Sequence, residues 1–194
     1  MTDAFFEPTA GGFEPTELTR GPWNRDHQHA GPPAALLGRA LEQHEPRPEA
    51  QFGRVTYELL RGVPIAPLQI ATRTLRGGRR VELLEASLSD ADGEVMRATA
   101  WRLRTTHVEY PDPPAAPDAE PPPLPDAGHP GTFFPTGESV GYHSAMEYRF
   151  VRGGFTELGP ATVWMRMGVP LLPGEEPTPL QRVSCRRTPA TASV

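Results

Sequence analysis

The stretch GPPAALLGRALEQH, residues 31–44, decides the fold of this 194-residue chain. It opens with two prolines, which favour the first turn of a helix because that turn does not need their missing N–H groups. Apolar residues then recur at helical spacing on one side and also fill the other side: Ala34, Leu37, Gly38 and Leu41, then Leu36 and Ala40. A helix that is apolar nearly all round is buried, so the sequence predicts a buried helix over residues 32–44. Gly38 lowers the helix propensity, so we expect a close neighbour at that position.

After this helix the apolar pattern changes to a period of two. Alternating runs begin near Val55 and return at residues 68–74, 81–89 and 94–104. Glycine-containing turns separate the later runs, as is typical of hairpins. Together with a short leading strand near residues 4–13, the pattern predicts an α+β fold in which an antiparallel sheet wraps around one helix.

Prolines divide the chain. Many of its 25 prolines fall within residues 109–135, which we expect to be an extended connector without a helix or a strand ladder. This connector separates an N-terminal domain, residues 1–108, from a second block, residues 136–183.

The second block starts the same pattern again. Alternating runs at residues 146–150 and 162–167 precede Thr178-Pro179, a strong helix-start signal. By the same alternation Trp164 is expected to be a core or sheet-interface aromatic.

Bulk properties exclude several classes of protein. The net charge of −5 argues against a nucleic-acid binder, which needs a basic patch. No apolar run approaches the ~20 residues of a membrane-spanning helix. The single cysteine, Cys185, cannot form an internal disulfide, so a cytoplasmic location is the default expectation.

Two stretches carry a family resemblance: LTRGPWNRDHQHAGPPAALLGRALE at 18–42 and PLLPGEEPTPLQRV at 170–183. They resemble the TesB-like acyl-CoA thioesterases, in the actinobacterial branch with two hot-dog units in one chain. In that family each unit wraps a sheet around a helix, the units pair edge to edge, and acyl-CoA lies between them. The resemblance therefore implies a hot-dog fold and hydrolysis of an acyl-CoA thioester to free acid and CoA, without metal or cofactor. It also implies self-association through sheet edges.

The end of the chain departs from the resemblance. Residues 184–194 break the apolar period begun at Leu180 and Val183. Back-translation with GC-rich codons permits another reading frame, which restores an Asp-x-Gly-Asn-Gly run typical of the family. The hypothesis is a truncation or frameshift near Ser184 that leaves the second hot-dog domain, from residue 136 to 183, only begun. The family's water-polarising Asp, Thr or Ser, and Gln lie mostly in the second unit, and none matches a residue here. The alternative function is therefore a non-catalytic acyl-CoA-binding or degenerate hot-dog protein that self-associates.

The candidate site is the polar loop immediately before the predicted helix. The N–H groups of Gly31 and Ala34 are expected at the positive end of the helix dipole, where they can polarise a thioester carbonyl. Asp26 or His29 is then the candidate catalytic base that orients water. Asn24 and Gln28, with Gly31 and Ala34, are the candidate substrate-binding residues. The competing interpretation is that these residues only cap the helix and satisfy the loop backbone.

Two other chemistries fit this loop less well. His27-x-x-x-Gly31 matches the start of the hot-dog dehydratase pattern HxxxGxxxxP, but Leu36 stands where that pattern needs proline. His27 and His29 have no Cys or Glu partner at ligand spacing, so no metal site is expected.

Overall fold

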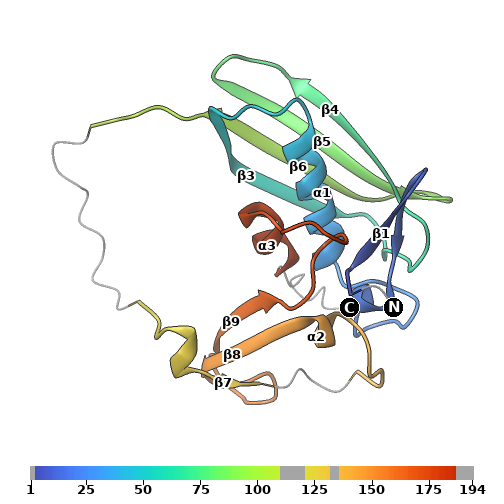
Figure 1. Ribbon diagram of the computed structural model, residues 1–194, viewed down its shortest axis with the longest axis vertical. Coiled ribbons are helices and arrows are strands. Elements are labelled where there is room, and N and C mark those ends of the chain that lie inside the picture. The colour runs from blue at the N-terminus through green and yellow to red at the C-terminus, as the bar shows by residue number, and fades with distance from the viewer. Residues whose placement is uncertain (1–2, 110–120, 132–135, 187–194) are drawn as a thin grey trace.

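The computed structural model describes residues 3–109, 121–131 and 136–186. Its larger sheet has four antiparallel strands in the order β3-β6-β5-β4. These strands are β3 (Ala50–Leu59), β4 (Gln69–Arg76), β5 (Val81–Asp90) and β6 (Gly93–Arg104). The helix α1 (Gly31–Gln43) lies across one face of this sheet (Figure 1). The predicted helix and the meander after it are therefore confirmed.

The N-terminal segment is a hairpin and not the single strand expected near residues 4–13. Strand β1 (Phe6–Thr9) pairs antiparallel with β2 (Gly12–Pro15). Gly12 has a φ of 156°, a backbone angle that residues other than glycine rarely adopt. The turn signal was present in the sequence as Gly11-Gly12. A bridge from Phe13 to Leu68 then attaches this hairpin next to the start of β4, and the short helix η1 (Glu17–Thr19) follows it.

The second part of the chain forms a smaller sheet in the order β7-β8-β9. Its strands are β7 (His129–Pro130), β8 (Met146–Arg152) and β9 (Thr162–Met167), and α2 (Tyr142–Ala145) leads into β8. Two elements fall inside the expected connector. The short helix η2 (Pro125–Ala127) is followed by β7, and β7 pairs with β8. The expectation that this segment forms no ladder is corrected there. Residues 110–120 and 132–135 of the connector lie outside the described residues.

The last helix, α3 (Pro179–Cys185), begins where the sequence predicted. The Thr178 hydroxyl accepts a hydrogen bond from the backbone N–H of Gln181 and so caps the helix. In Figure 1, α3 lies beside α1. The close neighbour expected at Gly38 is this contact, since a Cβ there would meet Leu180 and Ser184 of α3, and Tyr57 of β3, at 3.4–3.6 Å. Of the tail, residues 187–194 lie outside the described residues.

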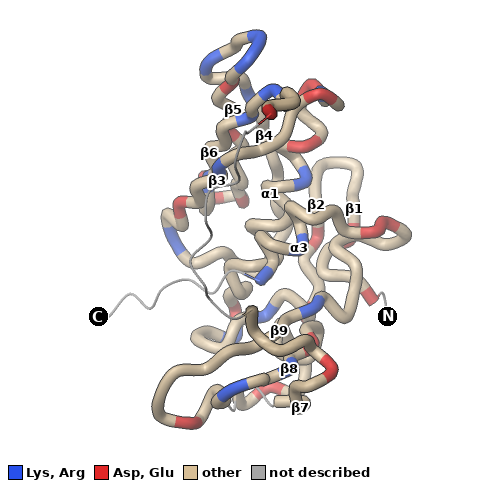
Figure 2. Tube along the Cα trace, turned by 90° about the vertical axis from the view of Figure 1, so that its left-hand side faces the viewer, with Lys and Arg blue, Asp and Glu red and all other residues tan. Residues whose placement is uncertain are grey.

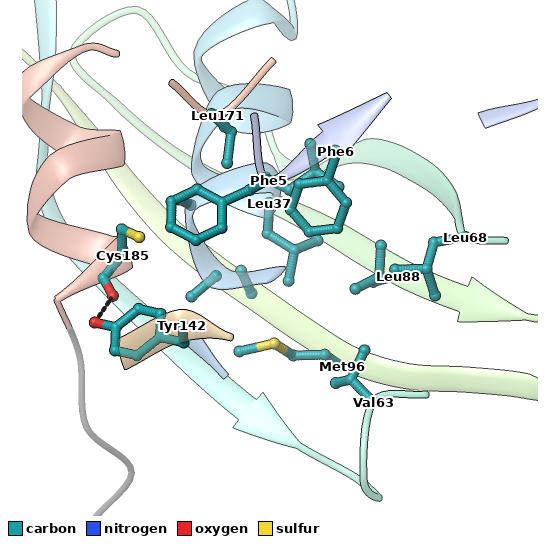
Figure 3. Packing of buried hydrophobic residues seen from close by; sticks show 14 of the residues in the cluster. Phe5, Phe6, Leu37, Val63, Leu68, Leu88, Met96, Tyr142, Leu171 and Cys185 are labelled. Carbon is teal, nitrogen blue, oxygen red and sulfur yellow. Dashed lines mark hydrogen bonds between the residues drawn. The ribbon is translucent and has the colours of Figure 1, made fainter. Parts of the chain in front are cut away.

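One hydrophobic core joins the two parts. Leu36, Leu37 and Leu41 of α1 are completely buried. They pack in one cluster with Phe5 and Phe6 from the hairpin, with strand residues of the large sheet, and with residues of the second part that include Tyr142 and Leu171 (Figure 3). Backbone hydrogen bonds from Phe5 to Pro170 and from Phe6 to Leu171 hold the hairpin against the second part.

Trp164 corrects another expectation. Its side chain is 37% exposed, and its indole N–H donates to the backbone oxygen of Pro123. Val163, Met165 and Met167 are the residues of β9 that pack on the core. Figure 2 shows charged residues spread along the chain, with basic residues gathered on the β4–β5 turn.

Candidate functional site

The loop of residues 21–30 is held in place by backbone hydrogen bonds on two sides. Its Gln28 N–H donates to Val63 (2.8 Å) and its His29 N–H donates to Thr19 (2.7 Å). The loop therefore lies against the segment that follows β3, and it delivers its side chains to the first turn of α1.

Three of the predicted residues meet in a recess of about 110 Å³ at this end of α1. Asn24, Gln28 and His29 line it together with residues of the same loop, of the end of β3 and of the segment that follows: Gly21, Trp23, His27, Ala30, Leu59, Gly62 and Val63. The Gln28 amide donates through Nε2 to the oxygen of Pro64 at 2.6 Å. Its Oε1 is buried and has no hydrogen-bond partner within the described part of the chain. The recess therefore has an apolar rim, and Gln28, one of its lining residues, carries a buried acceptor without a partner among the described residues.

His29 is a neutral imidazole. Its Nδ1 accepts a hydrogen bond from the Gly31 N–H at 3.0 Å, so the ring proton belongs on Nε2. Its ring stacks on Tyr142, with the ring planes 8° apart. Burial lowers the pKa of His29 to about 4, because the charged form would lose its hydration. This geometry favours a hydrogen-bond donor at Nε2 over a general base.

The helix N-terminus does not offer the free N–H groups expected from the sequence. The Gly31 N–H is engaged by His29, and the Ala34 N–H donates to Ala30. Pro32 and Pro33 have no N–H to give. The backbone of α3 also covers this turn, because a Cβ on Gly31 would lie 2.1 Å from the Cys185 oxygen. Gly31 and Ala34 therefore shape the site without polarising a carbonyl in this conformation.

Asp26 stands apart from the recess. Its side chain is exposed. Its backbone N–H donates to the Asn24 side chain, and its backbone oxygen accepts a hydrogen bond from the Ile65 N–H. Within the described residues no hydrogen bond joins Asp26 to His29. The structure thus brings together Asn24, Gln28 and His29, and leaves Asp26 on the solvent side of the same loop.

Sequence reasoning missed a larger hollow between β3 and α3. Two adjoining pockets of about 660 and 370 Å³ lie there and share Phe52, Leu180 and Val183. At one end the Glu42 carboxylate accepts hydrogen bonds from Thr178 and Gln181. At the other end the Tyr57 and Ser184 hydroxyls lie 2.6 Å apart. No local signal could have found these pairs, because they depend on α3 folding back beside β3.

The described residues contain neither a metal-binding cluster nor a membrane-spanning helix. Within the described ranges, no three His, Cys, Asp or Glu side chains gather into a group that could hold a metal ion. No helix in the same ranges has the length and apolar character needed to cross a membrane.

Comparisons with known proteins place the N-terminal part of the chain. Residues 19–103 match the family described as "Acyl-CoA thioesterase N-terminal domain". Among curated proteins no match was found.

Solved structures resemble the chain in fold. One is a hot-dog-fold protein of unknown function from Alicyclobacillus acidocaldarius, with 19% identity and a TM-score of 0.59 over 85% of this chain and 61% of that one. Another is the tesB protein of Mycobacterium avium subs paratuberculosis, with 20% identity and a TM-score of 0.54 over 92% of this chain and 62% of that one. The chain thus spans about three fifths of the length of these structures. It has the hot-dog fold, and its residues 19–103 are similar to the N-terminal domain of acyl-CoA thioesterases.

Proposed function

We propose that this chain is an acyl-CoA thioesterase-like protein of the TesB type that receives the thioester at the N-terminus of α1. The observation that carries the proposal is the recess at that point, where Gln28 and His29 lie at the end of the buried helix. The similarity of residues 19–103 to acyl-CoA thioesterase N-terminal domains supports the same assignment.

The geometry suggests a division of roles within the loop. Asn24 and Gln28 bind the substrate, with the unused Gln28 Oε1 as an acceptor for a donor such as an amide N–H of the pantetheine arm. His29 donates from Nε2 to the thioester carbonyl oxygen, since its Nδ1 is already engaged. Gly31 and Ala34 shape the first turn beneath the substrate.

The base role then falls to Asp26. Its exposed carboxylate lies outside the recess, so it takes the proton of a water that attacks the thioester from the solvent side of the loop. The water oxygen forms a bond to the carbonyl carbon. As the carbon–sulfur bond breaks, the CoA thiolate leaves and takes up the proton held by Asp26. The products are the free acid and CoA.

A second function is favoured by two observations at the site. The Gly31 and Ala34 amides are engaged, and no hydrogen bond among the described residues connects Asp26 to His29. An arrangement without free amide donors suits a protein that binds acyl-CoA, or only self-associates, and does not hydrolyse it.

A thiol-release assay with acyl-CoAs of several chain lengths separates the two functions. The thioesterase proposal predicts CoA release by the purified chain, with a loss of about 100-fold or more in kcat for Asp26→Asn, the size of a general-base contribution. Arg76→Gln, on the exposed β4 surface outside the recess, is the matched control. Binding without release supports the second function, and release that Asp26→Asn leaves unchanged contradicts the base role.

A further inference from the structure

The hollow between β3 and α3 has an apolar wall and a basic end. The wall common to both pockets consists of Phe52, Leu180 and Val183. Val183 is 66% exposed there, although it is one of the apolar residues of α3. The two pockets, about 660 and 370 Å³, are in the size range of small-molecule sites. An apolar chain of moderate length therefore fits along this wall.

The basic end is the smaller pocket. Arg54 and Arg186 both line it, and none of its described lining residues is a carboxylate. The Nε of Arg186 is buried and has no hydrogen-bond partner among the described residues. A buried donor without a partner is costly, so an acceptor supplied by a ligand would stabilise it.

The position of Arg54 at this end follows from an irregularity in β3. The pairing of β3 with β6 shifts between Phe52 and Arg54, which makes Gly53 an extra residue. As a result Phe52 and Val55 are both partly buried against the core, and Arg54 lies between them at the rim of the pocket.

Among the described residues that line the hollow, Glu42 is the one carboxylate, and it is already hydrogen-bonded. Glu42 lines only the larger pocket, at the far end from Arg54 and Arg186. Its two oxygens accept hydrogen bonds from Thr178 and Gln181. Arg47 and Arg102 also line the larger pocket, and both pair with Glu82. The hollow thus has an apolar middle, paired arginines at one end, and Arg54 and Arg186 at the other.

We propose that this hollow binds a fatty acid anion of medium chain length, with its carboxylate between Arg54 and Arg186 and its chain along Phe52, Leu180 and Val183. The ligand is the free acid, which is the product class of the hydrolysis proposed above. Binding of the acid does not require turnover, so the inference stands or fails separately from the thioesterase activity.

Isothermal titration calorimetry of the purified chain tests the proposal. The probes are decanoate, decanol, which has the same chain without the charge, and CoA without an acyl group, which carries phosphates without the chain. The variants are Arg54→Gln, Arg186→Gln and Val183→Asn. The matched control is Arg76→Gln, an exposed arginine of β4 that lines neither pocket. Thermal unfolding of each variant checks that the fold is kept.

The expected result is that decanoate binds and that decanol binds at least tenfold more weakly. Each of Arg54→Gln and Arg186→Gln should weaken decanoate binding by about tenfold, the size of one charge-assisted hydrogen bond. Val183→Asn should weaken both chain ligands, and Arg76→Gln should change nothing.

Three results overturn the proposal. Equal affinity for decanol and decanoate removes the carboxylate anchor. Unchanged decanoate binding by both arginine variants moves the site elsewhere. If decanoate does not bind, and CoA alone binds but no longer binds to Arg54→Gln, the arginines bind phosphates instead.

Discussion

The imidazole of His29 lies flat against the phenol ring of Tyr142, with ring centroids 3.7 Å apart and planes 8° apart. The Tyr142 hydroxyl in turn donates to the backbone oxygen of Cys185 at 2.8 Å, as Figure 3 shows. Three distant segments, the loop before α1, the start of α2 and the end of α3, therefore meet around one aromatic ring. This junction holds the second part of the chain against the N-terminal part.

Tyr142 is expected to contribute to stability through both its hydroxyl and its ring. Tyr142→Phe leaves the Cys185 oxygen without its donor and should lower the free energy of unfolding by about 1–2 kcal/mol. Tyr142→Leu also removes the stack on His29 and should cost about 1 kcal/mol more. Urea unfolding followed by circular dichroism measures both values. If the two variants are as stable as the wild type, the junction does not hold the parts together.

The burial of His29 predicts a dependence of stability on pH. The folded protein holds the pKa of His29 near 4, whereas the unfolded chain has the ordinary value of 6.5. Below pH 6.5 His29 is protonated in the unfolded chain but stays neutral in the folded protein. The contribution of His29 to folding stability is therefore complete above pH 6.5 and is lost as the pH falls to 4. Between pH 7 and pH 4 the wild type should lose about 3 kcal/mol more than His29→Asn. Parallel losses in the two proteins, measured by urea unfolding across this range, would show that His29 is charged in the folded state.

The two glycines of α1 should respond in opposite ways to alanine. A Cβ at Gly31 would lie 2.1 Å from the Cys185 oxygen, so Gly31→Ala must displace α3 and should destabilise the protein by more than about 2 kcal/mol. At Gly38 a Cβ would find its neighbours at 3.4 Å or more, so Gly38→Ala should stabilise by up to about 1 kcal/mol through helix propensity. Thermal unfolding of the Gly31→Ala and Gly38→Ala variants measures both changes in stability. A gain in stability from Gly31→Ala would mean that α3 does not cover this turn.

Strand β3 is expected to mediate self-association. It lies at one end of the strand order of the large sheet, and such an edge presents unpaired backbone groups over its length. Leu59 and Leu60 are 48% and 51% exposed at its end. Light scattering coupled to size exclusion should therefore show dimers whose fraction rises with protein concentration. A monomer at every concentration would contradict this prediction.

The helix and meander could be predicted because their signal is local. The burial of α1 follows from apolar residues on all sides of one short segment, and each later strand shows its own alternation. For Trp164, the alternation of β9 gives two faces but not which one is covered. That choice depends on the core beneath Val163 and Met165, and the sequence does not show it.

The candidate site could be predicted only in part, for a similar reason. Asn24, Gln28 and His29 lie within one loop, so these members of the recess were visible as neighbours in the sequence. The engagement of the Gly31 N–H by His29 depends on a side-chain conformation. The contact with Tyr142 depends on chain folding across more than a hundred residues, and no pattern near His29 indicates it.

Hydrogen exchange with and without a non-hydrolysable acyl-CoA analogue tests the central claim most directly, because it locates where the ligand meets the chain. Acyl-CoA at the N-terminus of α1 predicts slower exchange for the amides of residues 23–31, next to the recess. Added protection at Phe52–Tyr57 and in α3 would be consistent with an acyl chain in the larger hollow. Unchanged exchange throughout residues 23–31 at saturating ligand would contradict the assignment of this loop as the thioester site.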